Sequence, residues 1–170
     1  EGGLSFVHKN MSIEEQANEI DMVKRSENGM ISDPITLSRH HKLQDAVNLM
    51  EKYKISGLPV VEEDRTLVGI ITNRDIRYQE NFDQLVEDVM TKENIVTSDI
   101  DTDLKKAKEI LSRYRIEKLP IVDENNKLIG LITIKDIDNL TEFPNACKDT
   151  KGRLRVGAGV GVGADTLERV

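Results

Sequence analysis

The stretch ISGLPVVEEDRTLVGIITNRDI at residues 55–76 recurs as IEKLPIVDENNKLIGLITIKDI at residues 116–137. The similarity extends beyond these two stretches without a gap. A shift of 61 residues places 35–77 on 96–138, and 15 of the 43 aligned pairs are identical. An ungapped internal match of this length indicates that one supersecondary unit occurs twice in the chain.

Each copy predicts the order strand, helix, strand, strand, helix. Apolar residues at helical spacing predict the first helix of each copy, and β-rich runs separated by short polar segments predict the strand pair. Because one copy is small for burying a core alone, we expect the two copies to pack sheet against sheet around one shared core. The expected elements are extended stretches at 35–37 and 95–97, helices at 43–53 and 104–114, strands at 58–61, 67–72, 119–122 and 128–133, and further helices starting near Asn73 and Ile134.

Each copy carries the same polar pattern where its last strand meets the following helix. The pattern is Thr72-x-x-Asp75 in the first copy and Thr133-x-x-Asp136 in the second. A threonine hydroxyl and the N–H groups of a helix start can hold a phosphate, and an aspartate in the first turn can accept both hydroxyls of a ribose. The alternative is that these residues are ordinary helix caps, worth about 0.5–2 kcal/mol each.

Basic and apolar residues near these patterns extend the candidate site. Arg74 and Lys135 add positive charge beside the aspartates, and Lys118 can either reach a phosphate or stay solvated. The apolar residues that are candidates for enclosing a purine are Pro59, Val60, Pro120 and Ile121.

Composition excludes several classes of protein. The 24 basic and 31 acidic residues give a net charge of −7, which disfavours a DNA-coating protein, and aromatic residues make up only 4%. No apolar run approaches the roughly 18 residues of a membrane span, and we see no signal peptide. Cys147 is the single cysteine, and the His40-His41 pair has no partner ligands at useful spacing. We therefore expect no membrane partner, no sequence-specific nucleic acid, no metal site and a cytoplasmic location.

The segments that flank the repeat have a different character. GGLSFVHKNMSIEEQANEIDMVKR at residues 2–25 predicts a strand over 2–8 and then a helix, with Ser12 and Glu15 at the spacing of a capping box. KDTKGRLRVGAGVGVGADTLERV at residues 148–170 predicts a glycine-rich buried strand over 153–162 and a helix from Asp165. Strand, helix and strand with an insertion between them suit a parallel α/β barrel that is interrupted once.

These strings resemble a known family along nearly the whole chain. The two repeats resemble the tandem CBS repeats of a Bateman module, and the flanks resemble the catalytic barrel of the IMP dehydrogenase family on either side of that insertion. The family usually has Ala-Ala-Val-Gly where this chain has Ala158-Gly159-Val160-Gly161. The resemblance implies an α/β fold, a pseudo-twofold pair of β-α-β-β-α CBS repeats inserted in part of a TIM barrel. The implied domains are partial barrel at 1–29, the first CBS repeat with its linker at 30–88, the second CBS repeat at 89–142, and partial barrel at 143–170.

The resemblance also implies a function. It implies a regulatory module that binds a purine nucleotide and controls a parent enzyme, which oxidises IMP to XMP with NAD in GMP biosynthesis. In the family the Thr-x-x-Asp pattern is associated with adenine nucleotides, so ATP or AMP is the expected ligand, with GTP and GDP as the other candidates. The alternative is a dimerisation or scaffold module that binds no ligand. NAD and a monovalent cation are expected in the parent enzyme only. Homo-oligomers are expected through the CBS modules, with a tetrameric or octameric parent. Because Cys147 does not match the catalytic loop of the family, we expect this chain to be a fragment that is inactive by itself.

Overall fold

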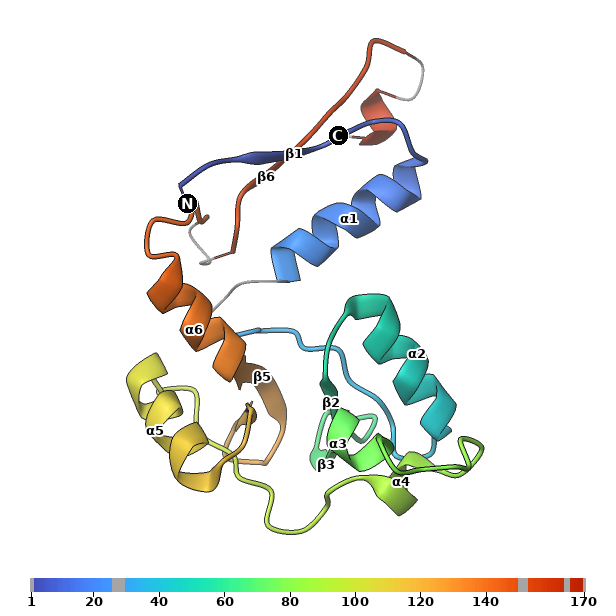
Figure 1. The fold of residues 1–170 in the computed structure, drawn as a ribbon, viewed down its shortest axis with the longest axis vertical. Coiled ribbons are helices and arrows are strands. Elements are labelled where there is room, and N and C mark those ends of the chain that lie inside the picture. The colour runs from blue at the N-terminus through green and yellow to red at the C-terminus, as the bar shows by residue number, and fades with distance from the viewer. Residues whose placement is uncertain (1, 26–29, 150–152, 164–165, 170) are drawn as a thin grey trace. The chain divides into compact units, whose positions relative to one another are not determined.

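The computed structural model describes residues 2–25, 30–149, 153–163 and 166–169 (Figure 1). The chain divides into two compact units. Unit 1 comprises Glu1–Gly29 and Lys135–Val170, and unit 2 comprises Met30–Ile134. The chain therefore leaves unit 1 once and returns to it after forming unit 2.

Unit 2 contains the two copies of the repeat, and their helices and hairpin strands lie where the sequence predicts them. Each copy has one helix followed by an antiparallel hairpin, and a further helix begins directly after each hairpin. The elements of the first copy are α2 (Leu43–Tyr53), β2 (Gly57–Val61), β3 (Leu67–Thr72) and α3 (Asn73–Ile76), with α4 (Val86–Val89) in the link. Those of the second are α5 (Leu104–Tyr114), β4 (Lys118–Val122), β5 (Leu128–Thr133) and α6 (Ile134–Glu142), which belongs to unit 1 from Lys135 onward.

The duplication is preserved in the irregular positions of the backbone. The register of the hairpin shifts between Val60 and Val61 in the first copy and between Ile121 and Val122 in the second. Lys54 and Arg115 end the helices α2 and α5 in the left-handed conformation that commonly terminates a helix. Because these features recur 61 positions apart, the two copies share one backbone design and not only a similar sequence.

The opening strands predicted at 35–37 and 95–97 are wrong as full strands. Each copy has a single parallel bridge there instead, between Leu37 and Val60 in the first copy and between Ser98 and Ile121 in the second. A parallel bridge of one residue gives too few backbone hydrogen bonds to define a strand.

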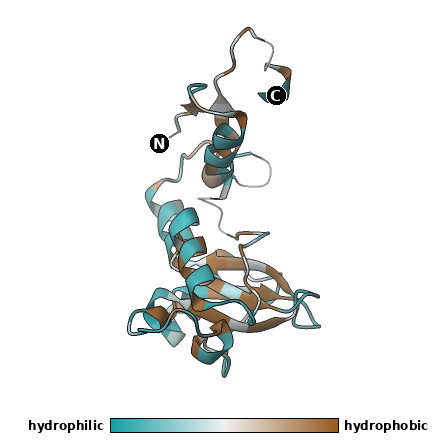
Figure 2. Cartoon of the chain, turned by 90° about the vertical axis from the view of Figure 1, so that its right-hand side faces the viewer, coloured by the Kyte–Doolittle hydropathy of each residue, from teal (hydrophilic) through white to brown (hydrophobic). Residues whose placement is uncertain are grey.

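The single shared core that the sequence predicts is also wrong. Leu43 and Ala46 of α2 pack with Leu58 and Ile71 of the same copy in one core cluster. The other buried members of this cluster come from the first copy or from α4 and the residue after it. A separate, smaller cluster of Val61, Leu67 and Leu128 joins the copies. The reason is that the apolar face of α2 covers the hairpin that follows it, so most burial is completed within one copy. Apolar residues accordingly concentrate on the hairpin strands, and the loops are hydrophilic (Figure 2).

Unit 1 contains a short parallel pair of strands and a helix. Strand β1 (Ser5–Val7) pairs in parallel with β6 (Val156–Ala158), and α1 (Ile13–Arg25) contacts both strands. A 3-10 helix, η1 (Leu167–Arg169), follows β6. The strand predicted over 153–162 is therefore shorter than expected, and it is half-buried instead of buried. The helix start predicted at Asp165 lies outside the described residues.

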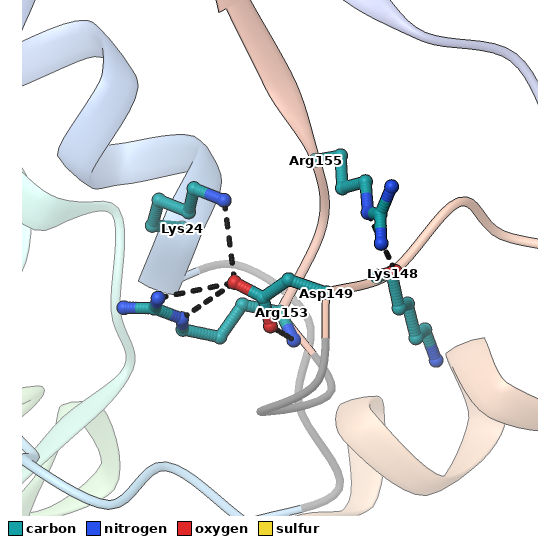
Figure 3. A network of polar contacts seen from close by, with 5 residues as sticks. All are labelled: Lys24, Lys148, Asp149, Arg153 and Arg155. Carbon is teal, nitrogen blue, oxygen red and sulfur yellow. Dashed lines mark hydrogen bonds and ion pairs between the residues drawn. The ribbon is translucent and has the colours of Figure 1, made fainter.

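Asp149 ties the end of α1 to the segment that leads into β6 (Figure 3). Its Oδ2 atom lies 3.4 Å from Lys24 Nζ and 3.0 Å from Arg153 Nη2, and its Oδ1 accepts a hydrogen bond from the Arg153 backbone N–H. Arg155 Nε donates to the carbonyl of Lys148 beside this cluster. These contacts connect the carboxyl end of α1 to the segment that precedes β6, within unit 1.

The predicted capping box at the start of α1 is confirmed. The backbone N–H of Ser12 donates to Glu15 Oε2 at 2.8 Å, and the backbone N–H of Glu15 donates to Ser12 Oγ at 3.1 Å. Hydrogen bonds from the backbone and the side chain of Ser12 lower the pKa of Glu15 below its usual value of 4.5. In unit 2, Thr66 lowers the pKa of Asp64 below 3.8 in the same way.

A Ser12→Ala substitution should raise the pKa of Glu15 toward its usual value. Because a lowered pKa in the folded state stabilises the fold above the unfolded pKa, the contribution of Glu15 should fade as the pH falls below about 4.5. NMR titration of the side-chain carboxyl resonances measures both groups. Thr66→Ala serves as the matched control, since it should move Asp64 and leave Glu15 unchanged. Equal shifts of both groups in either variant would contradict this assignment.

Candidate functional site

A cavity of about 300 Å³ lies within unit 2, where the corner between β3 and α3 meets the start of β4. This volume is at the lower end of the range typical of small-molecule pockets, which is roughly 300–1,000 Å³. Both copies of the repeat contribute to it. Its apolar lining residues are Ile70, Ile95, Val96, Ile116 and Pro120, and its polar and charged ones are Ser56, Thr72, Asn73, Arg74, Asp75, Thr91, Asn94, Glu117 and Lys118.

Thr72 and Asp75 are held together at the corner between β3 and α3. The backbone N–H and the hydroxyl of Thr72 both donate to Asp75 Oδ2, each at 2.7 Å. The structure thus shows these residues as a helix cap, which is the alternative that the sequence left open. A ligand that bonds to the Thr72 hydroxyl would have to share it with Asp75.

The two basic residues of the cavity connect the two copies. Lys118 is only 8% exposed, and its Nζ donates to Ser56 Oγ at 2.7 Å. Arg74 forms an exposed ion pair with Glu117 across the copies. The cavity therefore carries two cations and two carboxylates, and the positive charge predicted for Arg74 is compensated by Glu117.

Other predicted residues do not line the cavity. Pro59, Val60 and Ile121 are fully buried within β2 and β4, so their side chains form part of the protein interior. Thr133 ends β5, and Lys135 and Asp136 lie in the first turn of α6. The structure does not bring these three residues to the cavity.

Most of the apolar wall of the cavity was not predicted from the sequence. Ile70 alternates with the buried residues Gly69 and Ile71 along β3, so the period of two in that strand is the signal that could have found it. Ile95 and Val96 lie in the link that enters the second copy, where a strand was expected. Gly69 itself packs against Met90, since a Cβ atom there would approach the Met90 sulfur to 2.4 Å.

The folds of both units belong to the α/β class. In unit 1, helix α1 packs on a parallel pair of strands, an arrangement that is typical of parallel α/β proteins. The two strands are separated in the sequence by a long insertion. The described helices include none that is both long and apolar enough to cross a membrane.

Comparison with known proteins defines the family. The model of the IMP dehydrogenase / GMP reductase domain matches residues 1–170, and the chain therefore belongs to this family. The chain is 59% identical over 170 residues to the inosine-5'-monophosphate dehydrogenase of Halalkalibacterium halodurans, covering 100% of this chain and 35% of that protein. The chain thus spans about a third of the length of this relative.

Two kinds of solved structure are similar to the chain. A GMP reductase of Trypanosoma brucei in complex with guanosine 5'-triphosphate matches 98% of this chain and 41% of its own, with a TM-score of 0.84 and 31% identity. A CBS domain pair in complex with 5'-methylthioadenosine and S-adenosyl-L-methionine matches 66% of this chain and 94% of its own, with a TM-score of 0.60 and 31% identity.

The family assignment overturns the functional interpretation of the sequence. That interpretation made the chain a regulatory CBS module, with a scaffold module as its alternative. The family model instead matches both flanks and both copies as one enzyme domain, and the curated relative is a dehydrogenase along the whole chain. The flanks were correctly compared with the IMP dehydrogenase family, but the function assigned to this chain was taken from the repeat, whereas the family match covers the flanks and the repeat together.

Two features of the described residues bear on metal and dinucleotide binding. These residues include no group of three or more histidine, cysteine or acidic residues placed to hold a metal ion. Two of the glycines after β6 have little free space beside them. A Cβ atom at Gly159 would lie 3.3 Å from the Val7 carbonyl oxygen, and one at Gly161 would lie 2.4 Å from Lys9 Nζ.

A Gly57→Ala substitution should destabilise unit 2 and disturb the cavity. The new Cβ would lie 2.8 Å from the backbone carbonyl oxygen of Ile71 and 3.0 Å from Lys118 Cε, so backbone or side chain must shift. We expect a loss of about 1–3 kcal/mol in the free energy of unfolding, measured by chemical denaturation. Gly3→Ala is the control, because nothing lies within 4 Å of its added Cβ. Equal stability of the two variants would refute this account of Gly57.

Proposed function

We propose that this chain is part of an IMP dehydrogenase, an enzyme that oxidises IMP to XMP with NAD. In this proposal unit 1 supplies β1, α1 and β6 to the enzyme's TIM barrel. The observation that carries it is the parallel pairing of β1 with β6, in register from Ser5 with Val156 to Val7 with Ala158, across an insertion of more than a hundred residues. The 59% identity to a curated dehydrogenase favours this reaction over the reduction of GMP.

The cofactors and the assembly of the whole enzyme are part of this proposal. NAD would accept the hydride, and NAD and the monovalent cation would be held by residues other than those described here. A tetrameric or octameric enzyme in the cytoplasm is the corresponding expectation. Light scattering during gel filtration tests the assembly directly.

A chimaera tests the proposed reaction. Residues 1–170 replace the matching segment of the Halalkalibacterium halodurans enzyme, and NADH formation is followed with IMP and NAD. Because the two segments are 59% identical, we expect kcat/KM within about tenfold of the unmodified relative. A soluble, folded chimaera that forms no NADH would refute the proposal, and activity with GMP in the reductive direction alone would favour the reductase.

Unit 2 also has a proposed binding role, which concerns binding alone and not control of the reaction. We propose that residues 30–88 and 89–142 are two CBS repeats and that their cavity binds the nucleoside part of a purine nucleotide. The fold similarity to a CBS pair solved with two adenosine derivatives supports this proposal. A second site at Thr133, Lys135 and Asp136 stays a prediction.

The chemistry of the cavity suits such a ligand. The apolar side chains of Ile70, Ile95 and Val96 offer a surface for a base, and Asp75 offers a carboxylate to ribose hydroxyls. Lys118 is a donor already directed at the cavity-lining Ser56 hydroxyl. A phosphate that approached would compete with Glu117 for Arg74 and with Asp75 for the Thr72 hydroxyl.

Thr72→Ala should weaken nucleotide binding, whereas Thr133→Ala should not weaken it at this cavity. Both substitutions remove the threonine that precedes a helix at equivalent places in the repeat, but only Thr72 lines the cavity. Calorimetric titration with ATP, AMP, GTP and GDP should show the Kd of the bound nucleotide rise about tenfold for Thr72→Ala. Equal effects of both variants, or no binding by the unsubstituted chain, would refute the site.

A further inference from the structure

Gln16 is a buried polar residue of α1, with 3% of its surface exposed. Its Nε2 amide lies within hydrogen-bonding distance of three backbone carbonyl oxygens, at 3.2 Å from Val7, 3.3 Å from His8 and 3.0 Å from Gly159. Its Oε1 accepts a hydrogen bond from Arg169 Nη1 at 2.9 Å. The orientation of the amide follows from chemistry, because its nitrogen faces acceptors and its oxygen faces a donor.

The three carbonyls mark the carboxyl ends of the two parallel strands. Val7 is the last residue of β1, and His8 follows it. Gly159 follows Ala158, the last residue of β6, and its N–H donates to the Val7 carbonyl at 2.7 Å. One side chain therefore fixes the points from which both following loops begin.

Arg169 extends this connection to the far parts of the same loops. Its Nη2 donates to the Met11 carbonyl at 3.1 Å, in the loop between β1 and α1. It lies in η1, and Thr166, just before that helix, donates its hydroxyl to the Gly161 carbonyl at 2.6 Å in the loop after β6. The loops at 8–12 and 159–163 are thus joined to each other through Gln16 and Arg169.

We propose that Gln16 and Arg169 are positioning residues that set the spacing of these two loops at the substrate-binding face of the enzyme. Substrates of parallel α/β enzymes bind at the carboxyl ends of the strands, which is the end that Gln16 connects. A buried amide is costly unless each of its groups is paired. Here the amide nitrogen faces carbonyls at the strand ends, and the amide oxygen accepts from Arg169 of η1. This inference rests on the proposed function of the chain.

The test uses the active chimaera with Gln16→Met, which keeps the length of the side chain and removes its donors and acceptor. Arg169→Met is the second variant. It leaves Gln16 in place and removes the hydrogen bond from Arg169 to the Met11 carbonyl. Lys24→Met is the control in the same helix, since it removes only the contact with Asp149 at the other end of α1. Melting temperatures are measured for all variants, and kinetics are recorded well below them.

We expect kcat/KM for IMP or for NAD to fall at least about tenfold in Gln16→Met and less in Arg169→Met. Lys24→Met should keep kcat/KM for IMP and kcat/KM for NAD within about twofold of the unsubstituted chimaera. This should hold even if its melting temperature falls as much as that of Gln16→Met. Unchanged kinetics in a folded Gln16→Met variant would overturn the inference. An inactive unsubstituted chimaera would instead refute the proposed function.

Hydrogen exchange of the 170-residue chain gives a readout that does not depend on activity. Gln16→Met should accelerate amide exchange in the loops at 8–12 and 159–163, and Lys24→Met should not. Acceleration that is uniform over unit 1 in both variants would show a general loss of stability and would overturn the positioning role.

Discussion

The fold of unit 2 depends on backbone hydrogen bonds that each copy of the repeat supplies to the hairpin of the other. Ile31, at the entry to the first copy, exchanges two hydrogen bonds with Leu131 of β5, at 2.8 and 2.9 Å. Thr91, at the entry to the second copy, exchanges two with Ile70 of β3, at 2.9 and 3.0 Å. A lone hairpin is at best marginally stable, and its open edge invites unwanted pairing. Duplication solves both problems at once.

The hairpin loops repeat this exchange at the other end of the strands. The N–H of Leu67 donates to the Asn126 carbonyl, and the N–H of Leu128 donates to the Arg65 carbonyl, each at 2.9 Å. Arg65 and Asn126 both adopt positive φ angles, of 70° and 60°, which turn their loops for this contact. The sequence predicts the hairpins well because alternation and polar loops are local signals. It cannot predict these exchanges, because they depend on how two copies meet.

The candidate site shows the same division between local and non-local information. Thr72 and Asp75 could be found from their pattern and Lys118 from its place beside the apolar run of β4, and all three line the cavity. Val60 and Ile121 were expected to enclose a ligand, but their side chains point into the protein interior. A strand predicted without its packing partner does not reveal which of its two faces is buried. The face of each strand that is buried determines which of its apolar side chains can contact a ligand.

Unit 1 has the smaller number of regular elements among the described residues, yet the proposed reaction rests on its strand pairing. Each strand of its parallel pair has three residues, and Phe6 remains 70% exposed. So short a pair contributes few hydrogen bonds, and burial of Phe6 contributes little to its stability. The buried amide of Gln16 and the ion pairs of Asp149 therefore act as its specific connections, one at the carboxyl ends of the strands and one beyond their amino ends. Because the two connections lie at opposite ends of α1, a variant of each can separate loss of stability from loss of loop position.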